Sequence, residues 1–464
     1  MTLTGAPDIA IPGDQEYETA TQVFNLAAPA QPVAAITART IDQVRAAIRY
    51  ARAERMPVRV HTTGHAAAAA RPMHGALLIR TALEGGADID AVRRTARVTA
   101  GTRWAEVIDA AAPYGLAAPH GSSPLVGVVG YLLRGGVSFY GRRTGLAVNG
   151  VTAFELVTAD GELRRVDASS DPELFWALRG GGGGFGVVTA AEFALFPAAR
   201  VITGAAYWSA ADADRLLPLW LRWSRDAPRE VTTTLRLMNL PEHPDVPPEL
   251  NVGTVLCVDG AVLSPTDDVT AARAYAEDLL GPLRSVAAPL MDTWELAGPP
   301  AVAQTHMDPA EPFPVYGDHM LLGDLGEDGG TDALLRVAGH GSGSPLTNVE
   351  IRQLGGALAV PDPSGGVLDH LDARYAYMGG GVPFAPVTPE AITTHCAAVR
   401  AALTPWDTGR TTPTFVEHFE QPQGHLTPDQ VRALDRIRAR VDPAGLFGGD
   451  IAPGASARQT NGME

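Results

Sequence analysis

Five consecutive glycines at positions 180–184, followed by Gly186, are the residues best suited to hold a ligand against bare backbone. Polar residues usually flank a glycine run in a flexible linker, whereas Trp176, Leu178 and Phe185 flank this one. Backbone that lacks side chains but has apolar neighbours indicates the close approach of a ligand or of another backbone segment.

The spacing of Gly181, Gly183 and Gly186 matches the glycine fingerprint of dinucleotide-binding Rossmann domains. That fingerprint follows a strand and opens a helix, because the helix N-terminus holds the pyrophosphate. In this sequence a short amphipathic helix precedes the glycines and an apolar strand follows them. The order excludes a Rossmann site and favours a different nucleotide-binding architecture.

Two further loops with glycines adjoin apolar elements, at residues 61–66 and 121–145. Backbone N–H groups can cradle a phosphate only where side chains leave room, so three such loops favour a phosphate-containing ligand. The first loop holds His61 and His65, but no cysteine or carboxylate lies near them, so we expect no metal site. An isolated histidine is most often structural, and for His65 that alternative stays open.

A second group of candidates could move a proton. The sequence from 348 to 377 contains Glu350, Arg352, Gln353, Tyr375 and Tyr377. Strand alternation places Glu350 and Arg352 on one face and Gln353 on the other. A carboxylate whose pKa is raised by burial could serve as a general base. An exposed Glu–Arg pair and tyrosines that only pack are the open alternatives.

The elements that must position these residues follow from periodicity and capping. Three helices are expected, over 40–54, 103–112 and 427–441, with Thr40, Thr102 and Thr427 as their N-caps. Alternating or apolar runs predict strands at 57–60, 76–80, 95–100, 154–158, 163–166, 193–196, 231–238, 251–258 and 347–354. The turn at Asp160 and Gly161 predicts a hairpin between two of these strands. Residues beyond 447 read as a polar, frayed tail.

The bulk composition sets limits on architecture and partners. A chain of 464 residues is too long for one compact core, and glycine density falls after about residue 200, so we expect two domains. The net charge of −16 argues against nucleic acid or an anionic membrane as partner. Two cysteines, Cys257 and Cys396, make no disulfide framework or metal motif. Without a signal-peptide pattern or a long apolar run, a cytoplasmic location is expected.

Together the loops resemble the flavin-binding domain of the vanillyl-alcohol oxidase superfamily, in particular berberine bridge enzyme-like FAD-linked oxidoreductases. The resemblance is good over 10–200, moderate over 345–380 and 412–453, and hardly present over 205–340. The matching positions, in the family's order, are Pro12, Gly13 and Asp14, Tyr17, Asn25, and the segments 63–65, 121–130, 141–145, 156–161, 171–189, 350–357 and 441–447.

The resemblance implies an α+β fold with a two-part FAD-binding domain of the vanillyl-alcohol oxidase (PCMH) type. That domain would comprise residues 1–200 and the C-terminal segment 412–464. Between them, residues 201–411 would form an inserted substrate domain, a cap of antiparallel sheet backed by helices.

In that family, the histidine that ends the first loop is bonded covalently to the flavin 8α carbon, a role that falls on His65. The implied catalytic candidates are Glu350, Gln353, Tyr375 and Tyr377 on the cap. The implied FAD-binding residues act largely through their main chains. Among them, Val187, Val188 and Val151 would hydrogen-bond the adenine. The full set is His61, Thr62, Thr63, Gly64, His65, Gly121, Ser122, Ser123, Val126, Gly127, Val128, Gly130, Arg134, Gly141, Val151, Gly186, Val187 and Val188.

The sequence departs from the family at two informative positions. Ser123 stands where many relatives have a second flavin-bonded cysteine, and a hydroxyl does not replace that thiolate, so we expect attachment through His65 alone. Arg134 occupies a position that is glycine in the family. Its guanidinium would either pair with a flavin phosphate, the alternative we favour, or obstruct the site.

The expected function is that of an FAD-dependent oxidase. It would transfer hydride from an alcohol, sugar or secondary-metabolite substrate to flavin N5, with O2 as acceptor. Two alternatives stay open: an FAD-containing cyclase or lyase without net redox chemistry, and a ligand-binding protein without turnover.

Overall fold

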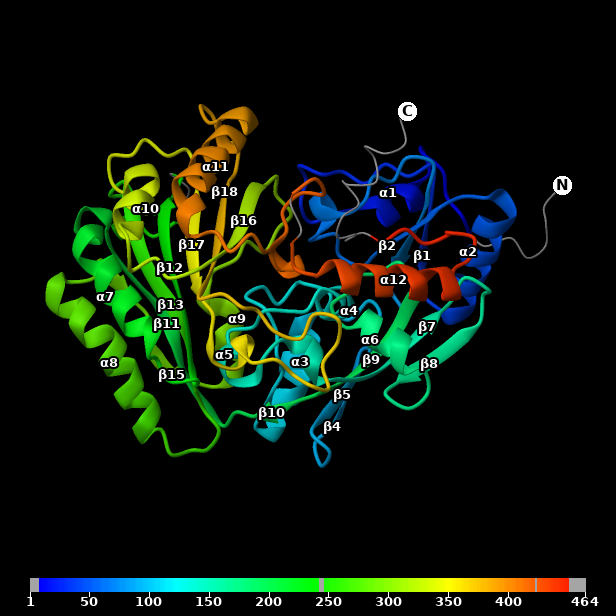
Figure 1. Cartoon of the computed structure of the whole chain (residues 1–464), viewed down its shortest axis with the longest axis horizontal. Coiled ribbons are helices and arrows are strands. Elements are labelled where there is room, and N and C mark those ends of the chain that lie inside the picture. The colour runs from blue at the N-terminus through cyan, green and yellow to red at the C-terminus, as the bar shows by residue number, and fades with distance from the viewer. Residues whose placement is uncertain (1–7, 242–245, 422–423, 450–464) are drawn as a thin grey trace.

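The computed structural model describes residues 8–241, 246–421 and 424–449, which form two lobes side by side (Figure 1). The expected polar tail lies largely outside the described residues. We call the lobe that contains the first ten strands the N-terminal lobe, and the lobe built on the large sheet that follows the cap lobe.

The N-terminal lobe contains a parallel sheet and an antiparallel sheet. The parallel sheet has the order β1 (Ala34–Ala38), β3 (Leu77–Thr81), β2 (Val58–His61). The antiparallel sheet has the order β4 (Ala87–Asp90), β5 (Thr95–Thr99), β9 (Val187–Ala194), β7 (Val151–Val157), β8 (Leu163–Asp167). A short pair, β6 (Leu116–Ala117) and β10 (Phe196–Pro197), lies near the junction with the cap lobe (Figure 1).

Helices pack on these sheets through apolar faces. In α2 (Ile41–Glu54), Val44, Ala47, Ile48 and Ala51 are buried at helical spacing. The remaining helices of this lobe are α1 (Gln15–Thr21), α3 (Trp104–Ala111), α4 (Val128–Leu133), α5 (Gly141–Thr144), α6 (Pro172–Leu178) and, from the C-terminal segment, α12 (Pro428–Val441).

The cap lobe is one antiparallel sheet with helices on its outer face (Figure 1). Its strands run in the order β14 (Met291–Asp292), β11 (Arg200–Ser209), β13 (Thr254–Ser264), β12 (Val231–Asn239), β17 (Asn348–Gln353), β18 (Tyr375–Gly381), β16 (Tyr316–Leu322), with β15 (Glu295–Ala297) beside β11. The outer helices are α7 (Ala213–Arg225), α8 (Thr270–Val286), α10 (Gly330–Ala338) and α11 (Pro389–Leu403); the short α9 (Val302–Thr305) contacts β11 and β13. This confirms the expected fold class.

The lobes are joined by more than the chain between β10 and β11. After β17 the chain returns to the N-terminal lobe, where Leu358, Val367, Leu368 and Leu371 belong to that lobe's apolar core. The C-terminal segment also returns there: the Val58 N–H donates to Leu446 O at 2.9 Å. The division at 201–411 remains a prediction, but the segment after β17 packs with the N-terminal lobe.

Most expected elements are present within a few residues, including the 163–166 hairpin arm. The expected N-caps Thr40 and Thr427 are confirmed, and each forms a capping box. The expected N-cap Thr102 is wrong. The N-cap of α3 is Arg103, whose backbone N–H donates to Glu106 Oε1 at 2.9 Å. The Thr102 backbone is instead paired with the next loop, since its carbonyl accepts from the Val128 N–H at 3.0 Å.

Candidate FAD and substrate site

The loop that ends in His65 leaves the carboxyl end of β2, the edge at which open sheets bind ligands. Gly64 has φ +70°, and a Cβ there would lie 2.6 Å from Val23 Cα. Only glycine allows this turn, which brings the loop against the segment that carries Phe24. The glycine therefore sets the position of the histidine beside it.

The His65 ring stacks on Phe24, with centroids 3.8 Å apart and an interplanar angle of 14°. Burial lowers the pKa of His65 to about 4, against the opposing charge of Asp308. Its Nε2 is buried and has no hydrogen-bond partner in the described chain. A neutral, fixed imidazole with an unsatisfied nitrogen fits a group meant to bond a flavin.

His61 differs from His65 although burial also lowers its pKa to about 4. Its Nε2 lies 2.8 Å from Ala20 O, so the ring is tied to the backbone. Thr62 is fixed through its hydroxyl, 2.7 Å from that of Thr81. Thr63 is half-buried in the same turn. These three residues shape the loop. His61 Nδ1 is also buried without a partner in the described chain, but the His61 ring is tied to the backbone through Nε2, whereas no described hydrogen bond holds the His65 ring.

The second loop packs directly on the first. A Cβ at Gly127 would lie 3.2 Å from Thr62 Cβ, and the Val126 carbonyl accepts from the Trp104 N–H at 3.0 Å. Ser123 is buried, with its Oγ accepting from the Leu125 N–H at 3.3 Å. Ser122 is half-buried beside it.

Gly130 marks an open space on this side of α4. It is exposed although Val128, Val129 and Tyr131 around it are buried, and a Cβ there would meet nothing within 4 Å. Gly121, by contrast, has Tyr131 within 3.1 Å of its Cβ position. An uncovered backbone patch inside a buried neighbourhood fits the approach of a flat cofactor, so the residues present are compatible with FAD.

The five-glycine run is held mainly by other backbone. A Cβ at Gly181 would lie 2.2 Å from Ala177 O, at Gly184 2.7 Å from Gly449 Cα, and at Gly186 2.6 Å from Val157 O. The sequence left open whether a ligand or another backbone segment approaches this run, and the structure shows the approach of other backbone segments. Gly183 is different, because a Cβ there would meet nothing within 4 Å.

Four other predicted FAD residues have protein neighbours. Val187 and Val188 pair with β7 at the start of β9, and Val151 opens β7. Gly141 opens α5, where a Cβ would lie 3.1 Å from Leu358. Their contact with adenine or flavin remains a prediction.

Arg134 ends α4, and its carbonyl accepts from the Thr414 hydroxyl at 3.1 Å. Its charge acts on two groups of the C-terminal segment. His425 has a pKa lowered to about 3, by burial first and then by Arg134. Burial and Asp318 raise the pKa of Glu417 to about 7, with Arg134 opposing. Arg134 thus has a carboxylate in its electrostatic range besides any phosphate.

The inner face of the cap sheet carries a buried polar cluster of five side chains. His306 is at its centre, with Nδ1 2.9 Å from Asp259 Oδ2 and Nε2 3.1 Å from Glu350 Oε2. At the ends, Arg236 lies 2.7 Å from Asp259, and Arg352 Nε donates to Glu350 Oε1 at 2.7 Å. We refer to these five as the cap cluster.

The charged neighbours in the cap cluster determine the pKa values of Glu350 and His306. Burial acts to raise the pKa of Glu350, but Arg352 and His306 outweigh it and lower the pKa to about 2. For His306, burial and Arg236 act to lower the pKa, yet the surrounding carboxylates raise it to about 9. The condition for Glu350 to act as a general base, a pKa raised toward neutrality by burial, is therefore not met, because the carboxylate has two cationic partners.

Glu350 and Arg352 share one face, as strand alternation predicts, but Gln353, Tyr375 and Tyr377 lie on the other. Gln353 accepts from the Thr233 hydroxyl at 3.1 Å and donates to Ser224 O at 2.9 Å. Both tyrosines belong to the core beneath the outer helices. Their position supports the packing alternative, and we do not assign these three a role in the reaction.

Sequence reasoning missed Arg236, Asp259, His306 and Tyr131. The first three lie on separate elements with no shared motif. The register of β12, β13 and β17 brings Arg236, Asp259 and Glu350 together, and α9 places His306, which follows it, between the two carboxylates. Alternation did signal Arg352, as the partner of Glu350. Tyr131 follows Gly130 directly, and its aromatic ring beside glycines was an unused signal.

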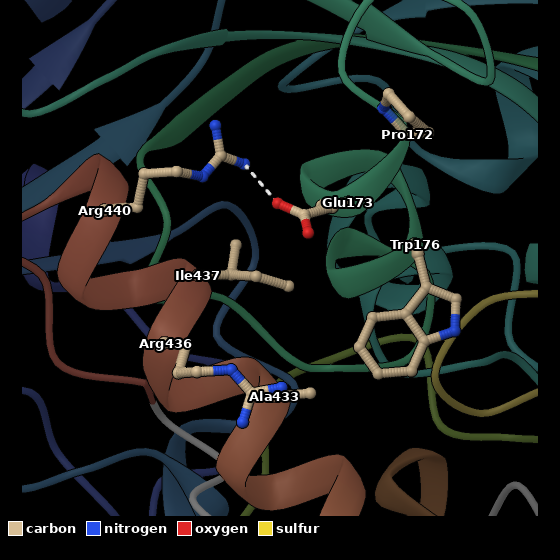
Figure 2. A pocket seen from close by; sticks show the side chains of 7 residues that line it. All are labelled: Pro172, Glu173, Trp176, Ala433, Arg436, Ile437 and Arg440. Carbon is tan, nitrogen blue, oxygen red and sulfur yellow. Dashed lines mark ion pairs between the residues drawn. The ribbon is translucent and has the colours of Figure 1, made fainter.

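A surface pocket of about 520 Å³ lies away from this site, between α6 and α12 (Figure 2). Its guanidinium from Arg440 pairs with Glu173 at 3.8 Å and with Asp171 at 2.9 Å. In the described parts of the chain, no three His, Cys, Asp or Glu side chains are grouped to hold a metal ion. Among the described helices, none has the length and apolar character needed to cross a bilayer.

Comparison with known proteins agrees with this geometry. Residues 32–167 match the family model described as an FAD binding domain. A carbohydrate oxidase of Microdochium nivale is 31% identical over 209 residues, covering 44% of this chain and 42% of that protein. The (R)-6-hydroxynicotine oxidase of Paenarthrobacter nicotinovorans is 30% identical over 203 residues, 44% of each chain. The matched part thus spans less than half the length of these relatives.

Solved structures extend the likeness to nearly the whole fold. The wild-type Physcomitrella patens BBE-like 1 protein superposes with a TM-score of 0.80 at 20% identity, covering 97% of each chain. The 6-hydroxy-D-nicotine oxidase of Arthrobacter nicotinovorans gives 0.79 at 21% identity, covering 95% of this chain and 96% of that one.

Proposed function

We propose that this chain, which carries an FAD-binding domain and has the berberine bridge enzyme-like fold, is an FAD-dependent oxidase of a small organic molecule. The observation that carries the proposal is His65, which is neutral, stacked on Phe24, and has a buried nitrogen without a partner in the described chain. Bound FAD would supply hydride acceptance from the substrate and electron transfer to O2.

The chain's own residues supply binding, orientation and proton transfer. His65 is the proposed covalent tether, and Ser123 forms no second bond. Thr62, Gly127 and Gly130 shape the backbone surface for the cofactor. The substrate would lie between that surface and the inner face of the cap sheet, where an alcohol, sugar or secondary metabolite would be oxidised.

Glu417 is the proposed proton acceptor, in place of Glu350. It follows Phe415 by two residues, and the Phe415 ring contacts the Arg352 guanidinium at 5.1 Å. The pKa of Glu417 is raised to about 7, first by burial and then by the negative charges of Asp318 and Glu350. The positive charge of Arg134 opposes this rise. Asp318 is itself paired with Arg400. A carboxylate that titrates near neutrality suits a general base, whereas Glu350, with a pKa of about 2, does not.

Acid precipitation of purified protein tests the tether. Yellow colour should stay in the wild-type pellet and pass to the supernatant in His65→Ala, while Ser123→Ala should behave like wild type. A proteolytic digest should give a flavin-bearing peptide that contains His65 alone. Colour that is fully soluble after precipitation of wild type would contradict the covalent bond.

Anaerobic absorbance spectra test the activity. Bleaching of the flavin by a member of a panel of alcohols, sugars and hydroxylated heterocycles, followed by recolouring in air, is expected of an oxidase. Conversion of a compound without bleaching would select the cyclase or lyase alternative. A colourless protein that binds no added FAD would select the non-catalytic one.

A further inference from the structure

Arg352 has donor capacity that the protein does not use. Its side chain is 2% exposed, and the hydrogen bond described for its guanidinium runs from Nε to Glu350. Its NH2 nitrogen is buried with no partner among the described residues. An unsatisfied buried guanidinium nitrogen is costly, which indicates a partner from outside the protein.

Aromatic rings hold that guanidinium in place. Its central carbon lies 4.9 Å from the Phe139 ring centroid and 5.1 Å from that of Phe415. Phe139 belongs to the N-terminal lobe and Phe415 to the segment that returns from the cap. Cation–π contact with both rings and the bond from Nε to Glu350 fix the group and leave the two N–H donors of its NH2 nitrogen without a described partner.

A second unsatisfied donor, the Tyr131 hydroxyl, lies within electrostatic range of Arg352. Tyr131 is 7% exposed, and its hydroxyl is buried without a hydrogen-bond partner in the described chain. Burial raises the pKa of Tyr131, and the charge of Arg352 opposes that rise, so the two groups interact electrostatically. The hydroxyl lies 3.7 Å from the Cβ position of Gly121, in the loop proposed to line the flavin.

Neither carboxylate of the cap cluster gives the Arg352 NH2 nitrogen a partner, although Asp259 Oδ1 is also buried without one in the described chain. Asp259 serves Arg236 and His306, and Glu350 is shared by His306 and Arg352. The next acid, Asp308, has a described contact with His306, at 4.0 Å. Two buried carboxylates are therefore shared among three cations, and Arg352 contacts only one of these carboxylates, Glu350.

We propose that Arg352 and Tyr131 form a binding site for an oxyanion of the substrate, so that the enzyme acts on carboxylate-bearing alcohols. This inference rests on the proposed function, because it places the substrate beside the flavin loop. A guanidinium whose NH2 nitrogen has two N–H donors without a described partner suits a carboxylate, and the tyrosine hydroxyl adds a neutral donor. Glu350, ionised and bonded to Nε, acts as the positioning residue of Arg352.

Benzoate binding to the purified holoenzyme tests the proposal, measured by calorimetry and by perturbation of the flavin spectrum. Arg352→Gln should weaken benzoate binding about 10- to 100-fold, the value of a charge-assisted hydrogen bond. Tyr131→Phe, which keeps the ring and its packing, should weaken it about 3- to 10-fold. Arg336→Gln, which removes an exposed arginine from α10, is the matched control and should leave it unchanged.

Benzamide, which has the shape of benzoate without its charge, should bind wild type and Arg352→Gln equally weakly. Unchanged benzoate affinity in both site variants would overturn the proposal. So would an Arg352→Gln variant whose flavin spectrum changes while its benzoate affinity does not, since Arg352 would then face the cofactor. Failure of the oxidase proposal shows separately, as protein that binds no flavin.

Discussion

His65 and His306 show how neighbours decide the charge of buried groups. Both rings are largely removed from water, which on its own favours the neutral form. His65 has an aromatic ring against it and stays neutral, with a pKa of about 4. His306 lies between Asp259 and Glu350, and its pKa of about 9 makes it a cation at neutral pH. One therefore suits a nucleophile and the other a fixed charge.

His306 should make stability depend on pH in the alkaline range. Its folded pKa is raised from 6.5 to about 9, so its contribution is full below pH 6.5 and is lost as pH rises through 9. The free energy of unfolding of wild type should exceed that of His306→Gln by about 3 kcal/mol at pH 6. Urea titrations should show this gap closing between pH 7 and 10. His340→Gln, at an exposed histidine, should show no gap, and a constant His306 gap would contradict the assignment.

Glu417 should control the pH dependence of turnover. Because its pKa is raised to about 7, the ionised form needed for proton acceptance becomes populated as pH rises through 7. The kcat/KM of wild type should rise about tenfold per pH unit below that value. Glu417→Gln should lose this limb and most of its activity while keeping its flavin. A limb that survives in Glu417→Gln would exclude this residue as the base.

At the scale of elements, the glycine run is explained by packing between segments. Gly181 and Gly186 lie against carbonyl oxygens of α6 and β7, and Gly184 against Gly449 after α12. The run thus lets a helix, a strand and the C-terminal segment meet without side chains between them. Its flanking apolar residues, noted in the sequence, are the buried contacts that fix it.

Two alanine substitutions separate close packing from backbone strain. Gly183→Ala, with φ +51° and no neighbour within 4 Å, should cost about 1 kcal/mol of folding free energy. Gly186→Ala, with φ +150° and Val157 O at 2.6 Å, should cost about 3 kcal/mol because backbone must also shift. Urea unfolding measures both. Equal losses would contradict the packing explanation.

Much of this fold could be predicted from local sequence patterns, whereas the rest depends on the pairing of strands that are far apart in the sequence. The strands before His65, the 151–167 hairpin and helices α2 and α12 follow from periodicity and caps that lie within a few residues. Thr102 looked like a cap because a single threonine does not reveal that its backbone is already paired with Val128. Arg236, Asp259 and His306 are far apart in sequence, so only the assembled cap sheet shows that they form one cluster with Glu350 and Arg352.

At the scale of the whole molecule, Arg142 links the two lobes. It is buried in α5 and donates to two backbone carbonyls of the cap lobe, Val231 at 2.8 Å and Ala227 at 2.7 Å, and to that of Leu354, where the chain leaves β17. These acceptors lie at the start of β12, on the chain before it and at the end of β17. One side chain therefore fixes how the cap sheet is set against the flavin loops.

Arg142→Met should lower the free energy of unfolding by about 3–5 kcal/mol, because three buried carbonyls lose a charged donor. Differential scanning calorimetry should show a lower Tm, with the cap and N-terminal lobes separating into two transitions. Arg143→Met is the neighbouring control, since Arg143 is exposed and 3.7 Å from Glu230. A variant at position 142 with the wild-type Tm would show that the lobes are held by other contacts.

The return of the chain after β17 limits how the cap can be exchanged between proteins. Arg179, beside the glycine run, donates to Ser364 O at 2.7 Å and to Gly365 O at 2.9 Å, and a Cβ at Gly180 would lie 2.5 Å from Leu368. Those partners lie on the connection between β17, which carries Glu350 and Arg352, and β18. If the whole cap were replaced by that of another protein, the host would lose the segment that packs against Arg179 and Gly180. A graft that takes β17 and β18 from the donor but keeps the host segment 354–371 between them would preserve these contacts, so that segment, and not the cap boundary, decides whether the exchanged protein folds.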